Sequence, residues 1–375
     1  MDDVHLCPLI FAERAQLSYC QALATTGAQP VVVLALPDDI IPDEKGRLKI
    51  LDIITEARQI VGDQARLCPA LPVNHMIFEP YGEIPVAHGV AHFHELAAIC
   101  NYAGADMVMI HRAYSLLQAR TAVLGARNAG LPVAVSLETM GEGDTLYGNT
   151  DILAAFVVLQ ELGISAFGFA SSVTALQIEP LKRILPYRKV PIFSITQNLT
   201  GQLSAEDTNA LFEYRARSLA QLGVGGIGIW GAQQEQLVQT AKALVEANPC
   251  ISISDELSSA SLWAANETQV YYLDENIEFS EPLRCRLDMT DDILEKERMV
   301  CDALCIELVS PDEAHSISLN NGTLDQMPVC FYTESEAALE AALFYYNGRA
   351  IIDSRVPLDE DIIKALSHRY GAVVI

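Results

Sequence analysis

The sequence has few basic residues for its length. Its 375 residues include 24 Lys and Arg against 49 Asp and Glu, which gives a formal net charge of −25. Binding to a nucleic-acid backbone needs clustered positive side chains, so this composition argues against a nucleic-acid partner. We interpret the excess of acidic residues as a solvated surface that keeps the protein in solution.

Long apolar runs are also missing. No stretch reaches the roughly 18 apolar residues that a membrane span requires, and the first residues, MDDVHLCPLIF, lack the basic segment of a signal peptide. The nine cysteines are scattered and form no CxxC pair. This usage is typical of buried, reduced thiols. We therefore predict a cytoplasmic protein with neither a membrane nor a nucleic-acid partner.

Short apolar runs that alternate with helical patterns make up most of the chain. Half of the residues are hydrophobic and 19% are charged, which allows a large core. Eight repeats of a parallel strand and a crossover helix close most naturally into a (β/α)8 TIM barrel, with an open doubly wound sheet as the alternative. The eight strand-like runs are His5–Phe11, Pro30–Leu36, Ala65–Pro69, Met107–Ile110, Val133–Leu137, Ala166–Phe169, Val190–Ile195 and Gly226–Trp230.

A polar, Ser-rich stretch interrupts this pattern after the eighth repeat. We predict a barrel domain over residues 1–250, a linker over 251–268 and a smaller α/β domain over 269–375. The last part again contains strand-like runs and helical patterns. At about 105 residues it is too short for a second full barrel.

Polar side chains follow three consecutive predicted strands. His111 and Arg112 end one strand, Glu138 ends the next, and Ser171 ends the third. Loops at the carboxyl ends of parallel strands usually carry the chemistry of α/β proteins. Arg112 can either pair with an acid such as Glu138 or bind an anion, and both readings stay open. A serine nucleophile is disfavoured because no histidine base can be assigned.

Three histidines, in the segment HGVAHFH, have a spacing that suits a metal ion. His88 and His92 share one helix face, but a third ligand is missing and His94 points elsewhere. We interpret the segment as a solvated helix face and predict no metal site. The glycine-rich segment GVGGIGIWG at 223–231 lies before and within a strand, so it does not fit a dinucleotide loop.

Several longer motifs carry a family resemblance. FEPYGEIPV at 78–86, LPVAVSLETMGEGDTLYGNTD at 131–151 and AAFVVLQELGISAFGFASS at 154–172 occur in a fixed order. They resemble the homocysteine-binding barrel of homocysteine S-methyltransferases and of cobalamin-dependent methionine synthase, over about residues 65–245. The resemblance implies a (β/α)8 barrel and a methyltransferase-type function.

The second domain resembles part of the same arrangement. MPVCFYTESEAALEAALFYYNGRAIIDS at 327–354 and HRYGAVVI at 368–375 are similar to the first half of a pterin-binding barrel. The resemblance implies a truncated, half-barrel-like domain. Because such a half barrel leaves open sheet edges, we expect it to be capped or paired with another chain.

The positions that hold zinc in this family differ here. The family uses one cysteine after the sixth strand and two adjacent cysteines after the eighth. In this chain Ser171 stands at the first position, and the segment Gly228–Gly231 reads GIWG at the others. A serine is a poor zinc ligand and tryptophan is none, so zinc-dependent activation of a thiol is predicted to be lost. The family has an acidic residue near the amine of the substrate, and His111 stands at that position here.

The predicted function is that of a divergent methionine-synthase-like protein that binds a small anionic molecule at the barrel mouth without zinc. Arg112 would clamp the anion, a ligand would stack on Trp230, and Glu138 or His111 would move a proton. The candidate catalytic residues are His111 and Glu138, and the candidate binding residues are Arg112, Ser171, Asn198 and Trp230.

The alternative function is a non-catalytic scaffold that docks a corrinoid protein. No resident cofactor is predicted for either function. A corrinoid or a folate would enter only through a partner, such as a corrinoid or methyltransferase protein. A homo-oligomer stays open.

Overall fold

The computed structural model describes most of the chain and divides it into two compact units. The described residues are 7–12, 17, 19–27, 30–73, 76–139, 150–171, 175–197, 205–231, 233–247, 262–274, 276–298 and 301–375. The first unit comprises residues 1–76, 87–147 and 164–254, and the second comprises 77–86, 148–163 and 255–375. Each unit is therefore built from segments that are separated in the sequence.

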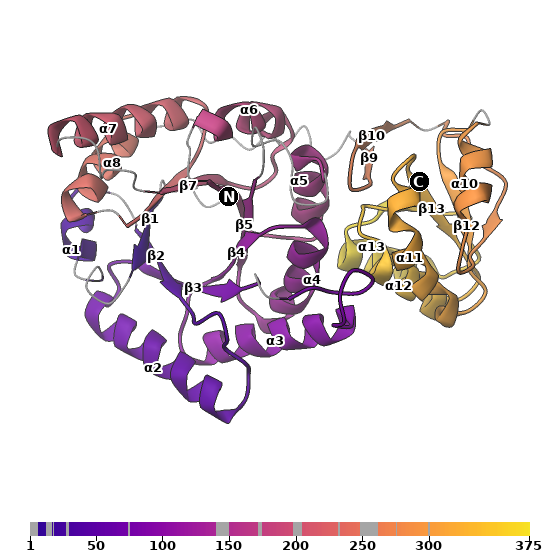
Figure 1. The fold of residues 1–375 in the computed structure, drawn as a ribbon, viewed down its shortest axis with the longest axis horizontal. Helices are drawn as coiled ribbons and strands as arrows, with labels where there is room; N and C mark the ends of the chain where they lie inside the picture. The colour runs from indigo at the N-terminus through magenta and orange to yellow at the C-terminus, as the bar shows by residue number, and fades with distance from the viewer. Residues whose placement is uncertain are drawn as a thin grey trace. The chain divides into compact units, whose positions relative to one another are not determined.

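The first unit contains a closed barrel of eight parallel strands (Figure 1). Neighbouring strands pair in chain order, and Cys7 pairs with Gly226 to join the first strand to the last. This closure agrees with the predicted barrel and excludes the open sheet. The strands are β1 (Cys7–Ala12), β2 (Val31–Ala35), β3 (Arg66–Pro72), β4 (Val108–Ala113), β5 (Val133–Glu138), β6 (Ala166–Ser171), β7 (Ile192–Gln197) and β8 (Gly226–Trp230).

Helices surround these strands on the outside, as Figure 1 shows. Local capping explains where some of them begin: Asp43 accepts a hydrogen bond from the Gly46 amide, and Ser115 accepts one from the Gln118 amide. No helix among the described residues is long and apolar enough to cross a membrane. The helices are α1 (Tyr19–Ala24), α2 (Glu44–Val61), α3 (Val86–Tyr102), α4 (Leu116–Ala126), α6 (Ala175–Ile184), α7 (Ala205–Gln221) and α8 (Gln234–Ala247), with short 3-10 turns η2 (Arg127–Ala129) and η3 (Leu185–Tyr187).

Apolar side chains from alternate strand positions form one buried cluster of the barrel. Because strand side chains alternate between two faces, residues two apart such as Val31 and Val33 join the same cluster. Packing of this kind leaves the strand ends as the place for polar chemistry. The cluster contains Val31, Val33, Cys68, Ala70, Met109, Ala134, Ala170, Phe193 and Ile195.

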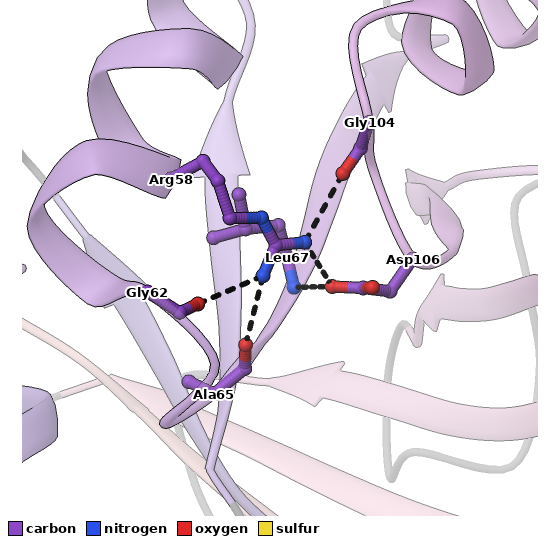
Figure 2. Close-up of polar contacts among 6 residues, drawn as sticks. All are labelled: Arg58, Gly62, Ala65, Leu67, Gly104 and Asp106. Carbon is purple, nitrogen blue, oxygen red and sulfur yellow. Dashed lines mark hydrogen bonds and ion pairs between the residues drawn. The ribbon is translucent and has the colours of Figure 1, made fainter.

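An arginine at the end of α2 ties together the amino-terminal ends of β3 and β4 (Figure 2). Arg58 donates to the carbonyl oxygens of Gly62 and Gly104, both at 3.0 Å, and to an Asp106 carboxylate oxygen at 2.5 Å. The same Asp106 oxygen accepts the Leu67 amide at 2.7 Å. This end of a barrel usually serves stability rather than chemistry.

Replacing Arg58 with Ala should lower the free energy of unfolding by about 2 kcal/mol. The substitution removes the charge-assisted hydrogen bonds of Arg58. Their contribution to stability is moderate because Arg58 and Asp106 are partly exposed. Urea denaturation of Arg58→Ala measures the change. Arg47→Ala, which removes an exposed arginine from the same helix, is the control. Equal stability of the two variants would contradict a structural role for the Arg58 network.

The second unit contains a five-stranded parallel sheet, a two-stranded hairpin and several helices. Helix α5 follows β5 in the chain, yet its contacts place it in this unit. The elements are α5 (Ile152–Glu161), β9 (Leu262–Ala265), β10 (Val270–Leu273), β11 (Leu283–Arg284), α10 (Thr290–Glu297), β12 (Leu304–Glu307), η5 (Pro311–Ala314), α11 (His315–Leu324), β13 (Val329–Tyr332), α12 (Glu336–Tyr345), β14 (Ile351–Ile352), α13 (Glu360–Tyr370) and β15 (Val373–Val374).

The hairpin β9–β10 covers one face of the five-stranded sheet. Cys330, Ile351 and Val373 are paired across neighbouring strands, so their side chains share that face. Ala264 and Leu273 of the hairpin pack in the same apolar cluster. The chain thus supplies its own cover for this face. Strand β9 lies within the stretch predicted as a linker, whose first part, 251–261, is outside the described residues.

Candidate functional site at the carboxyl ends of the barrel strands

Strand β4 does not stop at Ile110, where the apolar run ends. It continues to Ala113, and its pairing with β5 shifts register between Ile110 and Ala113. Within this bulge Arg112 has a φ of +56°, in the left-handed region. That conformation costs an ordinary residue roughly 1–2 kcal/mol and persists only where the surroundings enforce it. Bulges of this kind re-aim side chains beside functional sites.

Arg112 forms a two-point ion pair with Glu138 at the end of β5. Its Nε lies 3.0 Å from one carboxylate oxygen and its Nη2 lies 2.8 Å from the other. The side chains are 43% and 27% exposed, so small molecules can approach the pair. The hydrogen bond with Glu138 is the main reason that the pKa of Arg112 is raised. Glu138 therefore holds the guanidinium in one orientation, while Nη1 stays outside the pair.

Ser136 links the two halves of the bulge. Its hydroxyl oxygen accepts the Arg112 amide at 2.9 Å and lies 2.9 Å from His111 Nδ1. Burial above all, and then the Arg112 charge, lower the pKa of His111 to about 3. The imidazole is thus neutral near pH 7, and the Ser136 hydroxyl can donate to its Nδ1. A proton on the His111 ring is therefore disfavoured near pH 7.

Three of the residues that support this site, Gln118, Asp38 and Ser136, were not among the predicted candidates. Gln118 accepts the Tyr114 amide at 3.1 Å and donates to the Met76 carbonyl at 2.9 Å, which orders the turn after β4. Asp38, after β2, contributes to the raised pKa of Arg112. The rule of inspecting strand ends could have found Asp38. Ser136 could have been found as a polar residue inside the apolar run VAVSLE.

The structure brings together three of the predicted candidates: His111, Arg112 and Glu138. The backbones of Ser171 and Trp230 lie at the carboxyl ends of β6 and β8. Asn198 lies outside the described residues.

The sequence resemblance aligns Ser171 and Trp230 with zinc ligands of the homocysteine-binding barrel. Neither side chain is a thiolate, imidazole or carboxylate, which are the groups that bind zinc in proteins. Among the residues that the structure describes, no group of three or more His, Cys, Asp or Glu side chains could hold a metal ion.

Comparison with known proteins gives one consistent sequence relationship. The chain is 24% identical to methionine synthase of Mycobacterium tuberculosis over 287 residues, which cover 67% of this chain and 24% of the relative. It is 23% identical to methionine synthase of Mycobacterium leprae over 290 residues, with the same coverage. The chain thus aligns with about a quarter of the length of these relatives. No family model matches it.

Two solved structures are weakly similar to this chain. Homocysteine methyltransferase from Escherichia coli has a TM-score of 0.46 and 12% identity, over 66% of this chain and 97% of that one. The 3-hexulose-6-phosphate synthase from Salmonella typhimurium has a TM-score of 0.39 and 12% identity, over 64% of this chain and 99% of that one. Scores this low say nothing about function. The sequence similarity alone supports a distant homology between this chain and methionine synthase.

Proposed function

We propose that this chain is a methyltransferase-like protein that binds a small molecule with an anionic group at the mouth of its barrel and does so without zinc. The observation that carries the proposal is the Arg112–Glu138 pair, held between two barrel strands at their carboxyl ends. The surrounding sequence is similar to methionine synthase over 67% of the chain, which supports the family-level part of the proposal.

The pair favours a ligand that carries both an anionic and a cationic group. Glu138 already occupies Nε and Nη2 of Arg112, so a ligand carboxylate or phosphate would approach Nη1. A ligand ammonium group could at the same time lie against the Glu138 carboxylate. A simple anion would meet the repulsion of Glu138 without this compensation. A small amino acid meets both requirements.

Of the two catalytic candidates, the chemistry favours Glu138 over His111 as the group that moves a proton. Burial keeps the pKa of the His111 ring at about 3, so this ring binds a proton weakly near pH 7. Glu138 is partly exposed and lies beside the proposed ligand position. We assign His111 to positioning the bulge through Ser136.

Homocysteine and methionine are the probes that test the binding proposal. A ligand that binds only the native state at a hundred times its Kd should stabilise it by about 2.7 kcal/mol, which is seen as a rise in Tm. We expect this rise in the wild type and its loss in Arg112→Asn. Asparagine tolerates the left-handed backbone of position 112, so the bulge should survive.

The control for this experiment is Arg47→Asn, which removes an exposed arginine from α2 and should keep the full rise in Tm. An unchanged rise in Arg112→Asn would place the ligand elsewhere. No rise in the wild type with either probe would contradict the proposal of an amino-acid ligand.

The purified full chain should contain far less than one zinc ion per molecule, and added zinc should not change the response to homocysteine. The reason is the donor set at positions 171 and 230, which offers serine and tryptophan. Elemental analysis and the thermal assay with and without a chelator measure this. Stoichiometric zinc whose removal abolishes the homocysteine response would overturn the zinc-free part of the proposal.

The alternative function, a non-catalytic scaffold that docks a corrinoid protein, stays open. The hairpin β9–β10 packs on one face of the five-stranded sheet, so that face is not available to a partner.

A further inference from the structure

Two cysteines face each other across neighbouring strands of the second unit. Cys305 in β12 and Cys330 in β13 are directly paired in the parallel register, so their side chains leave the sheet on the same face. The two thiols are close enough for each to influence the pKa of the other. Cys305 is 7% exposed and Cys330 is fully buried. The proposed function uses neither of them.

The surroundings give the two sulfurs different properties. The neighbouring Cys330 thiol is the main reason that the pKa of the Cys305 thiol is lowered. The interaction with Cys305, together with burial, raises the pKa of the Cys330 thiol. The charge of Arg355 also favours the Cys305 thiolate, whereas Asp353 and Glu307 oppose it. One sulfur is thus suited to act as a nucleophile and the other to resolve the product.

We propose that Cys305 and Cys330 form a reversible dithiol–disulfide site that reacts with hydroperoxides. The Cys305 thiolate attacks one oxygen of hydrogen peroxide, which breaks the O–O bond, leaves a sulfenic acid and releases hydroxide that takes up a proton. The Cys330 sulfur then attacks the Cys305 sulfur, and the sulfenic oxygen leaves as water. Two thiols and one peroxide give one disulfide and two waters, so the thiols lose the two electrons that the peroxide gains.

The fold allows this bond with little movement. Neighbouring strands lie about 4.8 Å apart, which is within the roughly 4.4–6.8 Å that separates the Cα atoms of a disulfide. The burial of both sulfurs admits a small oxidant more readily than a bulky disulfide reagent. Hydrogen peroxide should therefore react faster than glutathione disulfide.

Cys301 provides an internal comparison. It lies four residues before Cys305 and is more exposed, but burial and the charge of Asp302 raise its pKa. If exposure decided reactivity, Cys301 would oxidise first. If the thiol pair decides it, Cys305 reacts first.

The test treats the folded full chain with hydrogen peroxide, blocks the remaining thiols and maps disulfides by mass spectrometry of peptides. We expect a Cys305–Cys330 link in the wild type and in Cys301→Ser, and reversal of the link by a thiol reductant. In Cys330→Ala, Cys305 should stop at the sulfenic acid, which a carbon nucleophile traps. Its rate of oxidation should fall by about three- to fourfold for each unit by which its pKa rises, because the loss of thiolate outweighs the gain in nucleophilicity.

The wild-type result needs no substitution, so a variant that fails to fold does not remove the test. Circular dichroism before and after oxidation shows whether the chain stays folded. The proposal is wrong if Cys305 remains reduced while Cys301 is oxidised. It is also wrong if Cys305 links to a cysteine other than Cys330 in the folded chain.

Discussion

Replacing Arg349 with Met should lower the free energy of unfolding by about 3 kcal/mol, as expected when one partner of a buried ion pair is removed. Arg349 is only 8% exposed and lies just before β14. Its Nη2 is 3.3 Å from a Glu161 carboxylate oxygen at the end of α5, and its Nε donates to the Gly371 carbonyl at 2.8 Å. The side chain therefore holds α5, β14 and the end of α13 together.

The expected loss of stability comes mainly from the two groups that no longer contact Arg349. Without Arg349, the Glu161 carboxylate loses a cationic partner in a mostly buried position, and the Gly371 carbonyl loses a donor. The backbone bridge between Arg349 and Ala265 needs no side chain and should persist. Urea denaturation followed by circular dichroism measures the change.

A double variant separates the effect of the Glu161 charge that has lost Arg349 from the effect of lost packing. Glu161→Leu combined with Arg349→Met removes both charges and should recover much of the stability, because apolar replacements of buried ion pairs are often neutral. Arg369→Met, which breaks the exposed pair with Glu340, is the matched control and should cost less than about 1 kcal/mol. A double variant as unstable as the single one would show that packing, not charge, sets the loss.

The stability of the second unit should fall as the pH rises from 4.5 to about 7, and Glu267→Gln should remove much of this slope. Burial foremost, and then the charge of Asp325, raise the pKa of Glu267 from 4.5 to about 7. Between these values the native state keeps a proton that the unfolded chain has released. Raising the pH in this window therefore lowers the stability, by about 3 kcal/mol when complete.

The surroundings of Glu267 explain why its ionised form is disfavoured. Its amide donates to an Asp325 carboxylate oxygen at 3.0 Å, and its carbonyl accepts the Asp151 amide at 2.9 Å. Asn347 donates to its carboxyl group at 2.9 Å and favours the ionised form, but burial outweighs this bond. The charge of Glu267 also contributes to the raised pKa of Tyr81, after burial. Burial also raises the pKa of Asp325 to about 6, so both acids act in the same direction.

Denaturation of wild type and Glu267→Gln at several pH values gives the measurement. The variant should be more stable than the wild type at pH 8 by up to about 3 kcal/mol, and equal to it near pH 4.5. Asp325→Asn should remove a separate part of the slope. Glu295→Gln, at an exposed position of α10, should leave the slope unchanged. Parallel curves for Glu267→Gln and wild type would contradict the assignment.

Most of the fold could be predicted from local patterns. Apolar runs separated by helical spacing identified the barrel strands, and the closure of β1 on β8 agrees with the number of repeats. The cover of the second sheet could not be predicted in this way. Strand β9 is short and follows a polar stretch, so nothing local distinguishes it from a linker. Its pairing with β10 and its packing on the sheet give it its structure.

The candidate site was predicted in part. The strand-end rule identified Arg112 and Glu138, and the structure joins them. The rule also treated His111 as a group that could titrate. Its burial beside Arg112 depends on the bulge in β4, which the apolar run ending at Ile110 does not reveal.

The sequence by itself determined the parallel α/β class, the excess of acidic residues and the residue types at the strand ends. These properties follow from composition, from the period of the apolar residues and from residue identity at each strand end. Only the tertiary structure decided that Arg112 is bound to Glu138, that α5 belongs to the second unit and that Cys305 faces Cys330. Each of these joins residues that are distant in the chain, and their contact depends on strand register and burial. Neither can be read from local sequence.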